Sequence, residues 1–182
     1  MQIIPIPFEK EITVGDDLSE LILSSGNILD GDIIVIAQKI ISKQEGRIVE
    51  LSSVSPSLLA QGISSQYGKD PNIVELILSE SKRIVRMKNG VIIVETHNGF
   101  ICANAGIDES NVVDGFATLL PLNSDTSAQI IRANIFKKTG KNVAIIISDT
   151  FGRPFRMGQT NFAIGISGLN PIFGLCWNSR LF

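Results

Sequence analysis

The apolar residues of this chain gather in short runs that are rich in β-branched side chains, and this pattern most limits the possible folds. Two of these runs extend from Ile33 to Ala37 and from Val143 to Ile147. Both are far shorter than the roughly 20 residues of a membrane-spanning helix, and both are typical of buried strands. With 182 residues, 44% hydrophobic and 19% charged, we expect a globular chain without a membrane partner.

Capping residues and helical periodicity predict four helices. The first follows Asp17, which forms a capping box with Glu20. Two more are expected to open at 55–56 and 70–71, where Pro follows Ser or Asp, and the second of these has an apolar face that we extend to Val85. A fourth is predicted from about Ser124 to Lys138.

The predicted strands complete a mixed architecture. They cover residues 31–40, a hairpin over 91–104 that turns at 98–99, residues 142–148 and the segment "NFAIGISG". A polar turn, "ISKQEGR", is expected after the first strand. These elements predict an α+β or mixed α/β fold with a mixed sheet, a β-hairpin and flanking helices.

Charge and cysteine content exclude some functions. The 16 basic and 18 acidic residues give a net charge of -2, which offers no global attraction for nucleic acid. Cys102 and Cys176 are far apart, which argues for a reducing compartment, and the first residues do not resemble a secretory signal. We therefore expect a cytoplasmic protein.

Two acids are predicted to lie just beyond strand ends. Asp108 stands in "CANAGIDESN", and Asp149 precedes Thr150 in "IIISDTFGRPFR". Carboxylates and hydroxyls are suitable ligands for Mg²⁺ or Mn²⁺. The alternative is that each acid only caps a turn, and for either acid alone this alternative is favoured. Arg153 and Arg156 favour the site, because guanidinium groups offset phosphate charge.

A second basic cluster follows the first strand. Lys39, Lys43 and Arg47 recur at intervals of four and could meet a polyphosphate, although a solvated basic turn is the simpler explanation. The chain has no Walker-type phosphate loop and no G-x-G-x-x-G motif. His97 is expected in a turn, and Cys102 is expected to be packed rather than nucleophilic.

Several ordered segments carry a family resemblance. They are "GDDLSELI", "DGDIIVIAQKIISKQEGRIVEL", "KDPNIVELILSESKRIVR", "NGFICANAGIDESNV", "LLPLNSDTSAQIIR" and "IIISDTFGRPFRMGQTNFAIGISGL". Together they resemble the coenzyme F420-0:L-glutamate ligases, the GTP-dependent γ-glutamyl ligases. The resemblance implies a mixed α/β homodimer that joins L-glutamate to F420-0 and uses Mn²⁺ or Mg²⁺, two ions in all, with K⁺ as a further candidate.

Residue by residue, the resemblance implies a metal site and a nucleotide site. Asp108 and Asp149 would bind one ion and Thr150 a second. The GTP contacts would be Gln38, Lys39, Lys43, Asn111 and an N-terminal loop of Glu9, Lys10, Glu11 and Ile12. Our own inference adds Arg153 and Arg156 as groups that neutralise the transferred phosphoryl group or hold a substrate carboxylate.

The implied reaction passes through an acyl phosphate. The F420-0 carboxylate would attack the γ-phosphate of GTP, and the glutamate amine would then displace phosphate. We expect an incomplete ligase-like domain over 1–172 and an atypical tail over 173–182, because family sequences continue differently after "GISGLNPIF". The alternative is an inactive fragment that serves only as a dimerising or metal- or nucleotide-binding module.

Overall fold

The fold is a mixed α/β arrangement, as the sequence predicts. The computed structural model describes residues 2–110, 112–152 and 157–171; the tail 173–182 lies outside them. Within those ranges, β1 (Ile33–Ala37), β7 (Ala144–Gly152) and β8 (Gln159–Ser167) form one sheet in the order β1-β7-β8. β1 runs parallel to β7, and β8 runs antiparallel to β7.

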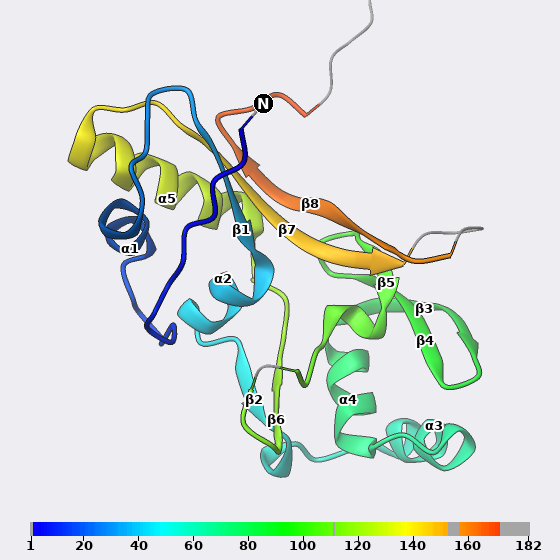
Figure 1. Cartoon of the computed structure of the whole chain (residues 1–182). Helices are drawn as coiled ribbons and strands as arrows, with labels where there is room; N and C mark the ends of the chain where they lie inside the picture. Colours follow the sequence, from blue (N-terminus) through cyan, green and yellow to red (C-terminus); the bar gives the residue numbers. More distant parts are fainter. Residues whose placement is uncertain (1, 111, 153–156, 172–182) are drawn as a thin grey trace, which may run out of the picture.

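Three helices pack with this sheet (Figure 1). They are α1 (Leu18–Ser25), α2 (Gln38–Gln44) and α5 (Ser124–Thr139). The Asp17 carboxylate caps α1 by accepting a 3.1 Å hydrogen bond from the Glu20 amide, which confirms the predicted start, and Gly26 follows its last residue. α5 also ends as predicted, at Gly140 in the left-handed conformation.

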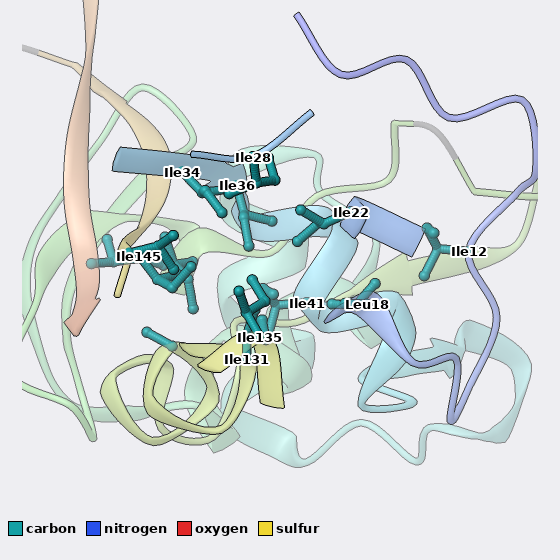
Figure 2. Packing of buried hydrophobic residues seen from close by; sticks show 14 of the residues in the cluster. Ile12, Leu18, Ile22, Ile28, Ile34, Ile36, Ile41, Ile131, Ile135 and Ile145 are labelled. Carbon is teal, nitrogen blue, oxygen red and sulfur yellow. The ribbon is translucent and has the colours of Figure 1, made fainter. Parts of the chain in front are cut away.

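The core of this half is built mainly from isoleucine (Figure 2). Alternate residues of the strands point inward, so Ile34 and Ile36 of β1 and Ile145 and Ile147 of β7 are buried. Ile135 of α5 meets them and is fully buried. Burial of each such side chain contributes about 1.5–3 kcal/mol, which fixes the register of β1 against β7.

A second core joins the remaining elements. The antiparallel sheet β3 (Ser81–Lys88), β4 (Val91–Thr96) and β5 (Ile101–Ala103) packs against α4 (Pro71–Ser79) and α3 (Leu58–Tyr67). A short ladder of β2 (Ile48–Glu50) and β6 (Phe116–Thr118) connects the two halves. Two short helices complete this half: η1 (Leu51–Ser53) directly follows β2, and η2 (Asn104–Gly106) directly follows β5. The β4–β5 hairpin is where the sequence places it.

A glycine sets the approach of β8 to α5. A Cβ at Gly165 would lie within 2.6 Å of the backbone oxygen of Ser124, the first residue of α5. No side chain fits that space. β8 therefore passes directly beneath the start of α5, and this contact holds the outer strand of the sheet in place.

Four local predictions were wrong. Residues 38–44 form α2 rather than part of a strand and a polar turn, and α3 begins at Leu58 after its cap Ser57, not at 55–56. Ile84 and Val85 belong to β3, since α4 ends at Ser79. β7 continues through Gly152, because β8 supplies ladder partners that no local pattern reveals. Among the described residues, no helix has both the length and the apolarity to cross a membrane.

Candidate functional site

The parallel pairing of β1 and β7 brings the candidate residues to one edge of the sheet. Ala37, the last residue of β1, lies opposite Ser148 of β7. α2 begins at the next residue, Gln38, without a connecting loop. Asp149 is therefore beside the start of α2. In open α/β sheets, the carboxyl ends of the strands are where ligands bind.

Asp149 and Thr150 lie inside a strand rather than beyond its end. Asp149 pairs with Phe162 of β8, and Thr150 pairs with Asn161. The interpretation of "SDT" as a simple turn is therefore wrong, as is its placement after the strand. A ladder position holds the Asp149 backbone more firmly than a turn would.

Asp108 is held by β6 and by its own loop. Its backbone forms a bridge with Thr118, through hydrogen bonds of 3.1 Å from the Asp108 amide and 2.8 Å from the Thr118 amide. Its carboxylate accepts hydrogen bonds from the Ser110 amide at 3.0 Å and from the Ser110 hydroxyl at 2.7 Å. The capping role that the sequence left open is thus confirmed, but it is not the only contact of Asp108.

Lys39 of α2 pairs with Asp108, and its charge also acts on Asp149. Its ammonium group forms an ion pair with Asp108 and donates a 2.6 Å hydrogen bond to the Ser110 hydroxyl. The same charge also acts on Asp149, where it partly opposes the rise in pKa that burial causes. We call Lys39, Asp108 and Asp149 the carboxylate corner. Two negative charges and one positive charge meet there.

The two carboxyl groups of the corner differ in protonation behaviour. Burial raises the pKa of Asp149 above its usual value, and the Asp108 charge raises it further; the Thr150 amide and Lys39 only partly oppose this. Burial also acts to raise the pKa of Asp108, but the hydrogen bonds from Lys39 and Ser110 outweigh it, so this pKa is lowered. A cation at the corner would stabilise both charged forms.

A left-handed turn precedes Asp108. Asn104, Ala105 and Gly106 have φ values of 52°, 55° and 70°. Positive φ costs about 1–3 kcal/mol for a residue such as alanine, and such strain persists only where the surroundings fix it. Leu120 packs where a Gly106 side chain would lie. The sequence analysis did not predict this turn. The only signal for it is the run of small residues in "ANAG".

The Thr150 side chain is exposed on β7 and contacts β8. It donates a 2.7 Å hydrogen bond to Asn161 Oδ1 across the ladder. Successive strand residues point to opposite faces, so we expect the hydroxyl and the Asp149 carboxylate to face different ways. The second ion predicted at Thr150 would accordingly be separate from one held by Asp108 and Asp149.

The predicted nucleotide residues of α2 divide into two groups. Gln38 is buried, and its amide donates to the Ser42 hydroxyl at 2.6 Å and to the Leu119 backbone oxygen at 3.3 Å. Its side chain therefore anchors α2 to the strand connection beneath it. Lys39 and Lys43 are one helical turn apart and carry the charge of this helix.

The N-terminal loop predicted to contact GTP lies against α2. Glu11 accepts a 2.9 Å hydrogen bond from Lys43, and this ion pair lowers the pKa of Glu11. Lys10 instead pairs with Asp16 at 2.7 Å, and Ile12 is buried in the core. Glu9 is exposed. The structure thus brings the loop to Lys43. Asn111, Arg153 and Arg156 lie outside the described residues.

An aromatic row, missed by the sequence reasoning, lies beside the corner. Phe100 and Phe151 have ring centroids 6.4 Å apart, and Phe151 and Phe162 stack at 5.8 Å with an angle of 30°. The nearby Cys102 is buried; burial and the Asp149 charge raise its pKa to about 11. Cys102 is packed, as predicted, and His97 lies in a turn with its ring 2.9 Å from the Ser79 backbone oxygen.

The donor set of the corner suits a hard cation. Within residues 2–110, 112–152 and 157–171, no group of three or more His, Cys, Asp or Glu side chains is placed to hold a metal. Two carboxylates are nevertheless what Mg²⁺ uses when substrate phosphates and water complete its shell. The Lys39 ammonium already occupies a cation's place beside Asp108. The corner therefore fits such an ion.

A cavity of about 660 Å³ lies elsewhere, along β1 and the N-terminal segment. Its lining is mostly aliphatic and includes Ile3, Ile4, Ile33 and Val35. Binding sites combine apolar walls with a few converging polar groups. The carboxylate corner has those groups, so we assign the functional site to the corner and not to this cavity.

Comparison with known proteins identifies the family. The profile of the F420-0:gamma-glutamyl ligase family matches residues 9–179. This chain belongs to that family. Among relatives named coenzyme F420:L-glutamate ligase, those of Methanothermobacter thermautotrophicus, Methanopyrus kandleri and Methanocaldococcus jannaschii are 51%, 43% and 50% identical over 89%, 93% and 84% of this chain.

The match covers only part of these ligases. The aligned region spans 66%, 67% and 61% of the lengths of the three relatives. All three members of the carboxylate corner fall inside the region that matches the F420-0:gamma-glutamyl ligase profile. The family resemblance noted in the sequence is therefore confirmed.

Proposed function

We propose that the protein is a GTP-dependent ligase that adds L-glutamate to coenzyme F420-0 through a γ-glutamyl linkage. The observation that carries the proposal is the carboxylate corner, where Lys39 of α2 pairs with Asp108 and its charge acts on Asp149 of a distant segment. The names of the relatives support glutamate and F420 as substrates. The corner supports phosphoryl transfer, because such catalysis depends on positioned charge.

The proposed reaction has two balanced steps. A carboxylate oxygen of F420-0 attacks the γ-phosphorus of GTP, and the bond to the bridging oxygen breaks, so that GDP leaves and an acyl phosphate forms. The amine of glutamate then attacks the acyl carbon. Phosphate leaves with the electron pair of the broken C–O bond, and the amine loses a proton as the amide forms.

The residues of the corner have distinct roles in this proposal. Asp108 and Asp149 would hold one Mn²⁺ or Mg²⁺ ion, with Thr150 at a second. Bound ions of this kind neutralise the charge of a transferring phosphoryl group. Lys39, released from Asp108, would turn to a phosphate oxygen.

The remaining candidate residues would complete the nucleotide site. Lys43 would leave its ion pair with Glu11 and bind a phosphate oxygen of GTP. The loop from Glu9 to Ile12 would border the nucleotide. Asn111, Arg153 and Arg156 would add further polar contacts. We also propose that the enzyme is a homodimer, as the family resemblance implies, and that it is cytoplasmic, as its cysteine content suggests.

The test is product formation by the purified chain. F420-0, GTP, L-glutamate and Mn²⁺ are incubated with the protein, and the product is followed by mass spectrometry. We expect a gain of one or more glutamate residues, one GDP per glutamate, and no product when a chelator is added. Absence of product together with absence of GTP binding would refute the ligase proposal and favour a non-catalytic binding module.

A further inference from the structure

The aromatic row ends in a ring that is open to solvent beside the corner. Phe100 and Phe151 are partly buried against the core, whereas Phe162 is 44% exposed. Phe162 is the direct ladder partner of Asp149. Side chains of directly paired residues lie on the same face of a sheet, so the Phe162 ring flanks the Asp149 carboxylate.

Stacking fixes this exposed ring. Phe162 packs on Phe151 at 5.8 Å with an interplanar angle of 30°, and Phe151 in turn packs on Phe100. An offset arrangement of this kind is favourable for aromatic pairs. One side of the Phe162 ring is thus supported by protein, and a planar ligand could stack on its exposed surface at little entropic cost.

The sheet order separates the aromatic row from the nucleotide residues. β7, which carries Asp149, lies between β1 and β8. Lys39 and Lys43 belong to α2, which directly continues β1, whereas Phe162 belongs to β8. The proposed GTP contacts and the exposed ring are therefore on opposite sides of Asp149.

This separation matches the geometry that phosphoryl transfer requires. The attacking and leaving oxygens are roughly in line across the transferred group. If GDP leaves toward α2, the acceptor carboxylate must approach from the side of β8. The acceptor F420-0 carries a planar deazaflavin ring, linked flexibly to its reacting carboxylate.

We propose that the Phe162 ring, backed by Phe151, is the surface on which the deazaflavin ring of the acceptor stacks. This inference rests on the proposed ligase function and adds a specificity-determining residue to it. Base–aromatic stacking changes affinity by roughly 5- to 150-fold when the aromatic side chain is removed. The affinity for GTP should not change when the Phe162 ring is removed.

The test compares two ligands on the full chain. Dissociation constants of F420-0 and of GTP are measured with Mn²⁺ for the wild type, Phe162→Leu and Phe162→Tyr. Phe136→Leu is the matched control, because Phe136 is 50% exposed but lies on α5. Thermal unfolding checks that each variant is folded.

We expect Phe162→Leu to weaken F420-0 binding by roughly 5- to 150-fold and to leave GTP binding unchanged. Phe162→Tyr, which keeps a ring, and Phe136→Leu should resemble the wild type. Weaker GTP binding with unchanged F420-0 binding would overturn the inference and assign the ring to guanine. Unchanged binding of both would overturn it while leaving the ligase proposal intact. A wild type that binds neither ligand would refute both.

Discussion

Replacing Lys39 by methionine separates its two roles at the corner. The ion pair with Asp108 and the hydrogen bond to Ser110 are lost, while the length and apolar part of the side chain are kept. The Lys39 and Asp108 side chains are 32% and 34% exposed. Their interaction should therefore fall between the values for exposed ion pairs and for buried charged hydrogen bonds, at about 1 kcal/mol.

From this magnitude, Lys39→Met should destabilise the protein without a divalent ion but strengthen its binding of that ion. Without metal, Lys39→Met should lower the melting temperature by about 2–4 °C. In the wild type, an ion that binds Asp108 must displace the ammonium group, which costs the same ~1 kcal/mol. Lys39→Met should therefore bind Mn²⁺ about fivefold more tightly in the absence of GTP.

Thermal unfolding over a Mn²⁺ titration measures both effects. The variant should melt below the wild type at zero Mn²⁺ and gain more stability as the ion is added. Lys82→Met, which changes an exposed lysine of β3, serves as the control and should follow the wild type. Equal Mn²⁺-dependent gains for Lys39→Met and the wild type would show that Lys39 does not compete with a cation.

Two further predictions concern stability and reactivity. The hydrogen bond from Lys138, with those from Ser19 and the Glu20 amide, lowers the pKa of Asp17; this stabilisation is therefore present above pH 4 and lost as the pH falls below it. Urea unfolding between pH 7 and pH 3 should show a smaller loss for Asp17→Asn, and Asp17→Ala should cost about 1 kcal/mol at pH 7; a wild-type pH dependence in both variants would contradict this. Because burial and the Asp149 charge raise the pKa of Cys102 to about 11, iodoacetamide at pH 8 should label Cys102 only after unfolding, and peptide mapping that finds it labelled in the folded chain would disprove its protection.

The helix boundaries that the sequence predicts well are those with a chemical cap. Asp17, Asp70 and Gly140 each satisfy or end a backbone hydrogen-bonding series, and the structure places them as predicted. The start of α3 was misplaced by two residues because Ser55 and Ser57 are both plausible caps. The sequence cannot distinguish two nearby serines as caps, because tertiary packing sets where the helix begins.

The parts of the site that the sequence could not predict depend on distant contacts. Asp149 lies within a ladder only because β8 pairs with it, and the aromatic row forms only across that ladder. α2 was missed because β1 runs into it without a turn residue at the junction. The acids themselves were found from their residue types, whereas the ion pair of Lys39 with Asp108 required the fold.

Glutamate addition by Asp149→Asn tests the central claim most directly. The wild type, Asp149→Asn and the control Glu50→Gln, which changes an exposed acid of β2, are compared by mass spectrometry with F420-0, GTP, L-glutamate and Mn²⁺. Melting curves establish that all three are folded. We predict glutamate addition by the wild type and Glu50→Gln, and none above background by Asp149→Asn. Undiminished product from folded Asp149→Asn would contradict the assignment of the carboxylate corner as the active site.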